Sequence, residues 1–494
     1  MGIVRRQSIL NTVYSYAGVA LGLLTKLVFF NAWLSKAEFG LIELLITFMV
    51  LGSELSQLGV SKLVLRFFPH FHQQGRVREG QFVFFALLYM LAGYGLFAGG
   101  ALIFRPAIVE SYAAKSPLFA ASFDYVFALV LAYTLYRVLS SLAQARLRSV
   151  MSTLSWNVVV RLVQLVLVLL YHYGGWSFEA FMYGIVLSFA VPAVLTGIDL
   201  VAAGGFAFRW GLSAIRRRTR RVLLVYGLYS SLGEMTAMMV NKVDMLMLGW
   251  LVGEEVVATY AIAFYITSLI QMPARALRAI TVPLIAKHMK HKAMQEIAVL
   301  YRKSGITSLV SASLVLIGIW VNLDPLFELT PKHAAGRYAV IFLGLGSLIN
   351  IITGLHRAII VNSRHYRFDL YMNVVLLVMA VGTNYWLIPA YGAAGASLAT
   401  AISLLIFNVG GCLFVWVKFR MHPFGPETLK ALLLGAAVLL LGLYLPATGH
   451  PLGDIALRST VVGVLYPALA LWLRLSPDLN DLAAMLWRRV RGVL

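Results

Sequence analysis

Residues 393–417 read AAGASLATAISLLIFNVGGCLFVWV, a run of apolar and small residues without a single charged side chain. A helix that crosses the roughly 30 Å hydrocarbon core of a bilayer needs about 20 predominantly apolar residues. This stretch is therefore long enough to cross a membrane once. Comparable stretches follow one another almost without interruption from Ser8 to Leu473. The repetition of this one element decides the fold.

The composition of the whole chain agrees with this interpretation. Of its 494 residues, 60% are hydrophobic and 12% are charged, which is too apolar for the surfaces of several water-soluble domains. The sequence predicts an all-α polytopic membrane protein of about fourteen transmembrane helices. We expect these helices near residues 8–34, 39–66, 81–104, 121–145, 151–172, 178–201, 222–250, 256–280, 304–322, 337–361, 368–388, 393–417, 428–446 and 455–474.

The positive charges are distributed unevenly among the loops. A formal net charge of +21 would be compatible with a nucleic-acid partner, but most Lys and Arg residues fall in alternate loops on one side of the membrane. The loops of the other side carry Lys36, Arg105, Lys115, Lys332 and Arg337. The positive-inside rule then predicts that both termini are cytoplasmic, and the basic run at 216–221 is expected to contact lipid headgroups. We expect no nucleic-acid partner.

The first apolar segment bears on how the chain begins. From Ser8 to Leu34 it is longer than the core of a signal peptide, and it lacks a small-residue cleavage site. We therefore expect it to be retained as a helix, with the mature chain beginning at Met1.

A weak internal repeat relates the first six predicted helices to the next six. Trp33 ends the first helix and Trp250 ends the seventh, and Asn157-Val158-Val159 follows the first tryptophan at nearly the same distance as Asn373-Val374-Val375 follows the second. Both halves begin on the same side, so the repeat is parallel, with a pseudo-two-fold axis along the membrane normal. Two six-helix lobes related in this way are expected to enclose a central cavity. The predicted organisation is an N-terminal lobe at 1–203, a basic cytoplasmic linker at 204–221, a C-terminal lobe at 222–420, and helices 13 and 14 with a basic cytoplasmic tail at 421–494.

Short motifs spread along the chain resemble one family. The turn Ser35 to Gly40, the helix end Arg66 to Pro69, the segment Asn241 to Asp244, the helix start Ala258 to Tyr260 and the turn Ile388 to Ala396 occur in its order and spacing. They resemble the polysaccharide and O-antigen flippase branch of the multidrug/oligosaccharidyl-lipid/polysaccharide exporter superfamily. The two helices beyond the twelve usual in drug exporters favour the glycolipid branch.

The resemblance implies a two-lobed, alternating-access carrier in the bacterial inner membrane. Its substrate would be an undecaprenyl-pyrophosphate-linked oligosaccharide, the unit of an O-antigen, capsule or exopolysaccharide. The expected partners are this lipid-linked oligosaccharide, membrane lipids and a polysaccharide polymerase complex. A lipid II flippase or a drug exporter of the same superfamily remains an alternative. The glycan, the coupling ion and the oligomeric state cannot be derived from the sequence.

Cations predominate among the charged residues inside the predicted helices. Such groups need a partner, a water-filled cavity or a nearby interface, and an arginine guanidinium can bind phosphate oxygens in a bidentate manner. Arg137 and Arg161 lie at similar, near-central depths on adjacent helices and are the first candidates for pyrophosphate binding. The predicted substrate site comprises Arg137, Arg161, Arg357, Arg275, Arg278, Lys26, Lys242 and Arg66, with His356 beside Arg357.

Each of these cations also has a structural interpretation. In this interpretation the arginines serve only to pair with Glu54, Glu234 or helix carbonyl groups, and Lys26 and Lys242 lie close enough to the outer surface to extend their ammonium groups to water. Among the acids, Glu54, Glu234 and Asp244 are candidates for ion coupling. For Glu54 and Glu234, a salt bridge to the cavity arginines is the slightly favoured interpretation.

Catalytic and cofactor motifs are absent from the sequence. It contains neither the G-x-x-x-x-G-K-[ST] loop of P-loop nucleotidases nor an H-E-x-x-H zinc motif, and Cys412 is the only cysteine. We therefore predict no metal site, no cofactor and no enzymatic activity. The alternative from another class is a membrane-embedded glycan polymerase or ligase. Such an enzyme would be expected to carry a large external loop. The loops between the predicted helices are too short for one.

Overall fold

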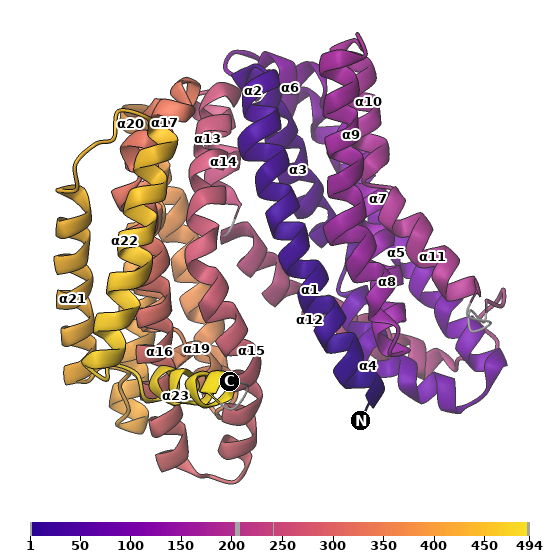
Figure 1. The fold of residues 1–494 in the computed structure, drawn as a ribbon. Coiled ribbons are helices and arrows are strands. Elements are labelled where there is room, and N and C mark those ends of the chain that lie inside the picture. The colour runs from indigo at the N-terminus through magenta and orange to yellow at the C-terminus, as the bar shows by residue number, and fades with distance from the viewer. Residues whose placement is uncertain (1, 203–207, 241, 492–494) are drawn as a thin grey trace. The chain divides into compact units, whose positions relative to one another are not determined.

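The computed structural model describes residues 2–202, 208–240 and 242–491, and within these ranges it consists of helices and connecting turns without strands. Figure 1 follows the chain from the indigo N-terminus to the yellow C-terminus. Twelve segments of the described ranges are long and apolar enough to cross a membrane. The prediction of an all-α polytopic membrane protein is confirmed.

The difference between twelve segments and about fourteen predicted helices has two causes. One segment, α20 (Arg367–Phe419), contains two of the predicted helices, which meet at Gly392. The predicted seventh helix, 222–250, is divided between α12 (Arg217–Val240) and α13 (Val243–Leu251), on either side of position 241, which lies outside the described residues. Neither half alone meets the length and hydropathy of a membrane span.

The chain divides into two compact units, Met1–Ala258 and Thr259–Leu494, and each is described by itself. The lobe and linker boundaries expected from the sequence stay a prediction. The first unit contains, in order, α1 (Gly2–Leu23), the π-helical segment η1 (Leu24–Phe30), α2 (Asn31–Trp33), α3 (Lys36–Gln57), α4 (Val60–Gln73), α5 (Arg76–Ala113), α6 (Pro117–Ala121), α7 (Tyr125–Ala145), α8 (Ser149–Leu154), the π-helical segment η2 (Ser155–Val159), α9 (Val160–Tyr173), α10 (Phe178–Ser188), α11 (Val191–Ala202), α12, α13 and the start of α14 (Glu254–Ser268).

The second unit begins within α14. It continues with η3 (Leu269–Gln271), α15 (Met272–Lys290), α16 (Met294–Val321), α17 (Leu323–Leu329), η4 (Pro331–Gly336), α18 (Arg337–Ile352), α19 (His356–Val361), α20, α21 (Pro426–Leu443), α22 (Pro451–Trp472) and α23 (Pro477–Arg491).

The apolar side chains are arranged as a membrane requires. In the first unit a core of buried residues joins α4, α5, α7, α11 and α12, and it includes Phe68, Phe82 and Leu142. Other large apolar side chains remain on the surface, such as Ile103 at 76% and Trp386 at 81% exposure. Because lipid tails are as apolar as the protein core, such a surface is expected where helices face the bilayer.

The predicted second helix, 39–66, is broken in the structure. Leu58 (φ 45°) and Gly59 (φ 75°) both adopt the left-handed conformation, and they separate α3 from α4. A β-carbon at Gly59 would collide with the backbone of Gly227 in α12. The break therefore serves a close approach between α4 and α12 that only glycine allows.

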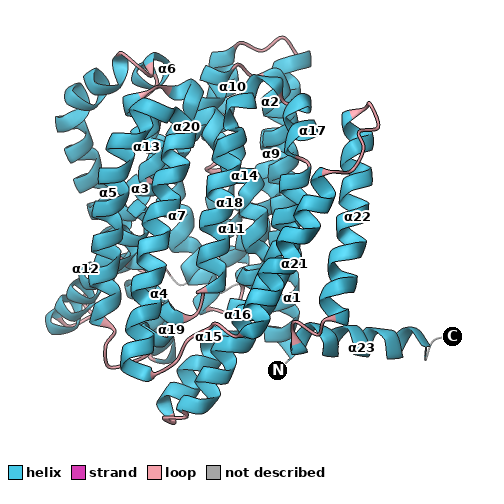
Figure 2. Cartoon of the chain, turned by 90° about the vertical axis from the view of Figure 1, so that its left-hand side faces the viewer, coloured by secondary structure: helices cyan, strands magenta, loops and turns pink. Residues whose placement is uncertain are grey.

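The C-terminal elements pack on one another and on α16. The core that includes Val321, Val438 and Tyr466 joins α16, α21 and α22. The tail predicted as basic contains a further helix, α23, which lies across the end of α22 in Figure 2. Its start is anchored by the contact of the Thr307 and Ser476 hydroxyls at 2.8 Å and by the bond from Asn480 Nδ2 to the Leu471 carbonyl at 2.8 Å.

Candidate functional site

Lys26 lies in the π-helical segment η1 and is buried in the first unit. Its Nζ atom donates to Glu43 Oε1 of α3 at 2.6 Å, and the two side chains are 6% and 1% exposed. A charge buried to this extent is tolerated only when a partner compensates it. Glu43 therefore provides the counter-charge that allows Lys26 to stay inside the helix bundle.

Arg137 of α7 forms an ion pair with Glu54 of α3. Glu54 is 2% exposed, whereas the arginine side chain is 21% exposed. The guanidinium lies 5.9 Å from the centre of the Tyr133 ring, one helical turn earlier on the same face. Tyr133 in turn packs against Trp156 of η2. The pairing that the sequence left open for Arg137 is present, and the guanidinium still reaches the protein surface.

Arg161 of α9 lies close to both of these ion pairs. Its Nη1 atom donates to Gln164 Oε1 at 3.3 Å, and its Nε atom lies against Gly22 of α1. The charge of Arg161 acts on Tyr133 together with those of Arg137 and Glu54, and it also repels Lys26, as does Lys242. Arg161 and Lys242 thus lie within electrostatic reach of Lys26, and Arg137 and Arg161 lie within electrostatic reach of Tyr133. We call Lys26, Arg137, Arg161 and Lys242 the first cationic cluster.

Two π-helical segments lie beside Lys26 and Arg161 of this cluster. Lys26 lies within η1, and Arg161 is the second residue after η2. The two helices cross closely, because a β-carbon added at Gly18 of α1 would lie 2.6 Å from the Asn157 β-carbon of η2. π-helical turns are rare and occur frequently at functional sites. Their position beside the cations is a structural signal that the residue pattern did not give.

Lys242 and Asp244 lie at the start of α13. Lys242 is half-buried and its Nζ lies 4.0 Å from Met245 Sδ, whereas Asp244 is buried and accepts from the Met245 backbone N–H at 2.8 Å. The Asp244 carboxylate thus accepts from one backbone N–H in the first turn of α13, a contact that the ion-coupling prediction did not consider. The predicted coupling residue Glu234 has a side chain that lies outside the described residues.

Arg66 lies on a different helix from the residues of the first cationic cluster. Its side chain is exposed on α4, and its guanidinium stands over the Tyr226 ring of α12 at 4.6 Å from the ring centre. A contact of this kind holds the arginine at the surface of the helix pair α4–α12 without neutralising it.

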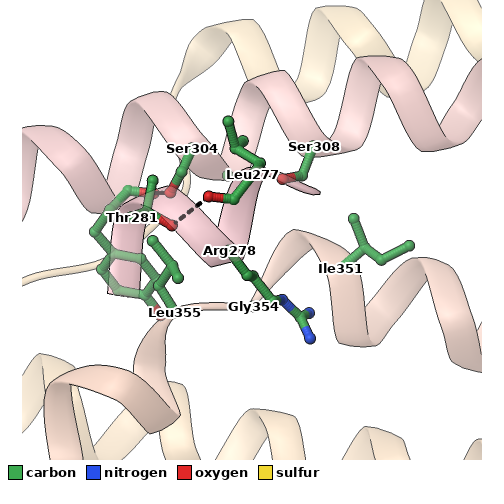
Figure 3. A pocket seen from close by; sticks show the side chains of 10 residues that line it. Leu277, Arg278, Thr281, Ser304, Ser308, Ile351, Gly354 and Leu355 are labelled. Atoms are coloured by element: carbon green, nitrogen blue, oxygen red, sulfur yellow. Dashed lines mark hydrogen bonds between the residues drawn. The ribbon is translucent and has the colours of Figure 1, made fainter. Parts of the chain in front are cut away.

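In the second unit, Arg278 of α15 lies beside a small polar pocket. Its Nη2 atom donates to the Asn350 carbonyl at 3.0 Å, and Gly354 leaves room for the guanidinium. Figure 3 shows Thr281 and Ser304 of the same pocket, with Thr281 donating to the Leu277 carbonyl. The cavity is about 10 Å³, which is room for roughly one water molecule. The pocket is too small for a substrate.

Arg278, Arg275 and Arg357 form the second cationic cluster, which belongs entirely to the second unit and has the buried His356 beside it. Arg275 is exposed on α15 and its charge acts on Arg278, while His356 is buried and lies within electrostatic reach of Arg278 and Arg357. Arg357 is bidentate to Asp369, at 2.9 Å from Nε to Oδ1 and 3.2 Å from Nη2 to Oδ2. Asp369 was not among the predicted residues.

The structure adds several residues that the sequence prediction did not assign to the site. Glu43, Tyr133, Gln164 and Asp369 each contact a predicted cation. Tyr133 precedes Arg137 by four residues and Gln164 follows Arg161 by three, which are the spacings that place side chains on one face of a helix. These two were within reach of sequence reasoning. Glu43 and Asp369 come from other helices, so no spacing indicates them.

Comparison with known proteins places the chain in a family. Residues 4–289 match the family model described as "Polysaccharide biosynthesis protein", which is more than half of the chain. The chain belongs to this family. Residues 230–386 also match the model named MatE. No curated protein matches the chain in a sequence search.

Solved structures show the same fold at low sequence identity. The lipid II flippase MurJ in an inward closed conformation superimposes with a TM-score of 0.73 at 12% identity, covering 94% of this chain and 99% of that one. An inward-facing MATE family multidrug transporter gives 0.62 at 17% identity, covering 81% and 94%. A superfamily transporter from Pyrococcus furiosus, described by the reversed polarity of its binding pocket, gives 0.56 at 15%, covering 85% and 95%. The family member described here is thus a multi-pass membrane protein with the fold of flippases and transporters.

Proposed function

We propose that the chain is a flippase for an anionic lipid-linked oligosaccharide. The substrate is an undecaprenyl-pyrophosphate-linked glycan that moves from the inner to the outer leaflet of the bacterial inner membrane. Movement occurs by alternating access of the two predicted lobes around a cationic central cavity, without a covalent step. The polysaccharide biosynthesis family match and the flippase fold support this proposal.

The observation that carries the proposal is the set of basic side chains in the first cationic cluster. Lys26 and Arg137 bind the buried carboxylates of Glu43 and Glu54, and Arg161 and Lys242 lie within electrostatic reach of Lys26. A site for cationic drugs would be expected to be rich in acids instead. An anionic headgroup can exchange with the carboxylates and form charge-assisted hydrogen bonds to the basic groups. Arg137 is the most suitable contact residue, because it is ion-paired yet 21% exposed.

The proposal is also consistent with the energetics of moving an anion. A pyrophosphate cannot enter hydrocarbon without compensation, because an unpaired buried charge is very costly. A membrane potential that is negative inside favours outward movement of an anion by about 2.3 kcal/mol per charge per 100 mV. The protein therefore has to supply a polar path and a counter-charge, and the polyprenyl tail can remain in lipid.

The orientation and partners follow the same proposal. Both termini are cytoplasmic, the lipid-linked oligosaccharide and membrane lipids are the ligands, and a polysaccharide polymerase complex receives the product. Lipid II carries the same polyprenyl-pyrophosphate chemistry, and the solved lipid II flippase has the same fold. Lipid II is therefore the second candidate substrate, and the experiment below separates the two.

Flipping can be measured in proteoliposomes that contain a fluorescent polyprenyl-pyrophosphate oligosaccharide, with lipid II and a neutral glycolipid as comparison substrates. We expect Arg137→Ala and Arg161→Ala to lower the flipping rate of the oligosaccharide about tenfold or more, because each removes a charge-assisted contact. The matched control is Arg148→Ala, since Arg148 is 48% exposed and paired with Asp199 away from the cluster. Unchanged flipping in both cluster variants would remove them from the site, and faster flipping of lipid II than of the oligosaccharide would reassign the substrate.

A further inference from the structure

Glu254, the first residue of α14, binds the start of a helix far from it in sequence. It is 3% exposed, and its carboxylate accepts hydrogen bonds from the backbone N–H groups of Leu118 at 3.2 Å and Phe119 at 3.0 Å. These N–H groups belong to the first turn of α6, where helices leave donors without partners. Such donors are normally capped by the side chain of the residue that precedes the helix. Here the cap comes from another helix.

The residue that would normally cap α6 is used elsewhere. Ser116 is completely buried, and its hydroxyl donates to the Gly249 carbonyl of α13 at 2.6 Å. Tyr112, near the end of α5, donates to the Leu246 carbonyl of the same helix at 3.0 Å. Three side chains therefore join the α5–α6 corner to α13 and to the start of α14.

Backbone packing makes this junction close. Gly253 has a φ of 131°, which favours glycine, and a β-carbon there would lie 2.5 Å from the Lys115 carbonyl oxygen. A β-carbon at Gly40 of α3 would collide with the carbonyl of Glu254. The two turns thus approach each other through backbone atoms, and Glu254 lies at the point of contact.

The position of the junction in the chain suggests its role. Both turns lie on the predicted outer side, where the loops carry few basic residues. By the predicted boundaries the α5–α6 corner belongs to the N-terminal lobe and the α13–α14 turn belongs to the start of the C-terminal lobe, and in the structure both lie within the compact unit Met1–Ala258. In a carrier that alternates its access, contacts between lobes on the outer side have to break before a substrate can leave on that side.

We propose that the Glu254 carboxylate is a releasable latch on the outer side, which caps α6 while the outward path is shut and leaves it when the path opens. The inference rests on the proposed function. Two hydrogen bonds to a carboxylate can stabilise the conformation in which the outward path is shut. Because there are only two, they can also break once in each transport cycle. Once separated, the carboxylate and the α6 donors can both be hydrated at the outer surface. Glu254 acts as a positioning residue and does not contact the substrate.

The latch can be tested by the accessibility of a cysteine. Cys412 is the only native cysteine, so Cys412→Ser gives a background for the single reporter Ser116→Cys, whose position is buried in the junction. The reporter is labelled in spheroplasts with a membrane-impermeant maleimide. We expect Glu254→Ala to raise the labelling rate about tenfold, and Glu254→Gln to raise it less, since the amide oxygen still accepts. The matched control is Glu255→Ala, because Glu255 is the exposed neighbour in the same helical turn.

Each outcome decides the proposal. Equal labelling of the Glu254→Ala and Glu255→Ala proteins would overturn the latch. If Glu254→Ala fails to fold, as judged by its thermal unfolding in detergent, the comparison of Glu254→Gln with Glu255→Gln decides in its place, and equal labelling there would also overturn the latch. Labelling needs no substrate. A protein that shows the expected labelling but flips no lipid-linked oligosaccharide would therefore refute the proposed function and leave the latch in place.

Discussion

The two units bind the basic side chains of their predicted membrane helices in different ways. In the first unit, Lys26 and Arg137 are ion-paired with the buried carboxylates of Glu43 and Glu54. In the second unit, Arg278 donates to a backbone carbonyl, and Arg357 pairs with Asp369, where the arginine side chain is 47% exposed. The first unit thus uses opposite charge in its interior, and the second uses backbone dipoles and a pair near its surface.

This difference bears on how each unit would respond to an anionic ligand. In the first unit a pyrophosphate has to compete with carboxylates already bonded to the cations, so binding there is an exchange of partners. In the second unit the acceptor for Arg278 is the Asn350 carbonyl, which carries no net charge and so does not cancel the positive charge of the guanidinium. Buried ion pairs are also costly to break from one side only. The predictions below test this comparison, in order of decreasing expected effect.

The largest effect is expected from Glu43→Ala in the first unit. Removing the partner of Lys26 leaves a buried ammonium uncompensated, which costs about 3–5 kcal/mol of unfolding free energy. The measurement is unfolding in mixed micelles. The double variant Lys26→Met, Glu43→Leu is expected to recover most of the loss, because it removes both charges. A double variant as unstable as Glu43→Ala would mean that the pair contributes through its packing.

A smaller effect is expected from Arg278→Ala in the second unit. The variant loses one charged hydrogen bond and leaves the Asn350 carbonyl without this donor, which corresponds to about 1.5–3 kcal/mol. The same unfolding assay measures it, with Arg275→Ala as the control, since Arg275 is exposed on the same helix. If Arg278→Ala lowers the free energy of unfolding as much as Glu43→Ala does, the contrast between the two units is wrong.

Arg357→Ala is expected to change stability by about 1 kcal/mol or less, because exposed ion pairs contribute little. Its flipping rate for the labelled oligosaccharide should nevertheless fall, since the sequence prediction assigns Arg357 to the substrate site. A matched surface variant is Arg337→Ala, because the Arg337 side chain is 50% exposed and pairs with Asp324. Equal flipping rates in the two variants would separate Arg357 from the substrate path.

The smallest effect concerns an ion pair at the start of α7. Both terminal oxygens of Asp124 accept from Arg105 at 2.8 Å, and this bonding lowers the pKa of the Asp124 carboxyl below its ordinary value. A lowered folded-state pKa adds stability above the ordinary aspartate pKa of about 4, and this contribution disappears as the pH falls through the folded value. Asp124→Asn should therefore reduce the pH dependence of the unfolding midpoint between about pH 5 and 2. An unchanged pH profile would contradict this.

Most of the fold follows from the sequence, because segment length and hydropathy determine where a chain can cross a bilayer. The turn at Gly392, with φ of 54° and ψ of −126°, lies between the two predicted helices 368–388 and 393–417. The prediction missed the break at Leu58, although Gly59 lies in the largely polar stretch 56–62, because a single glycine does not by itself end a predicted helix. Only the approach of Gly227 accounts for it, and that contact joins segments far apart in the chain.

Less of the candidate site could be derived. Charged residues at membrane depth identified Lys26, Arg137 and Arg161 because such residues are rare and costly. Their partners Glu43 and Glu54 lie on a different helix, and a pairing between helices depends on their rotation, which hydropathy does not determine. The same limit applies to Glu254, which appears in the sequence as one of two adjacent acids that begin a helix.

The π-helical segment that carries Lys26 predicts where the chain tolerates the deletion of a single residue. A wide turn of this kind accommodates one residue more than an α-helix would, and each residue turns an α-helix by about 100°. Loss of one codon between positions 24 and 30 would restore regular winding and rotate one end of the segment against the other. Lys26 could then no longer face Glu43 while α1 keeps its crossing with η2. A single-codon deletion here should thus be far more harmful than one in the loop at 445–450.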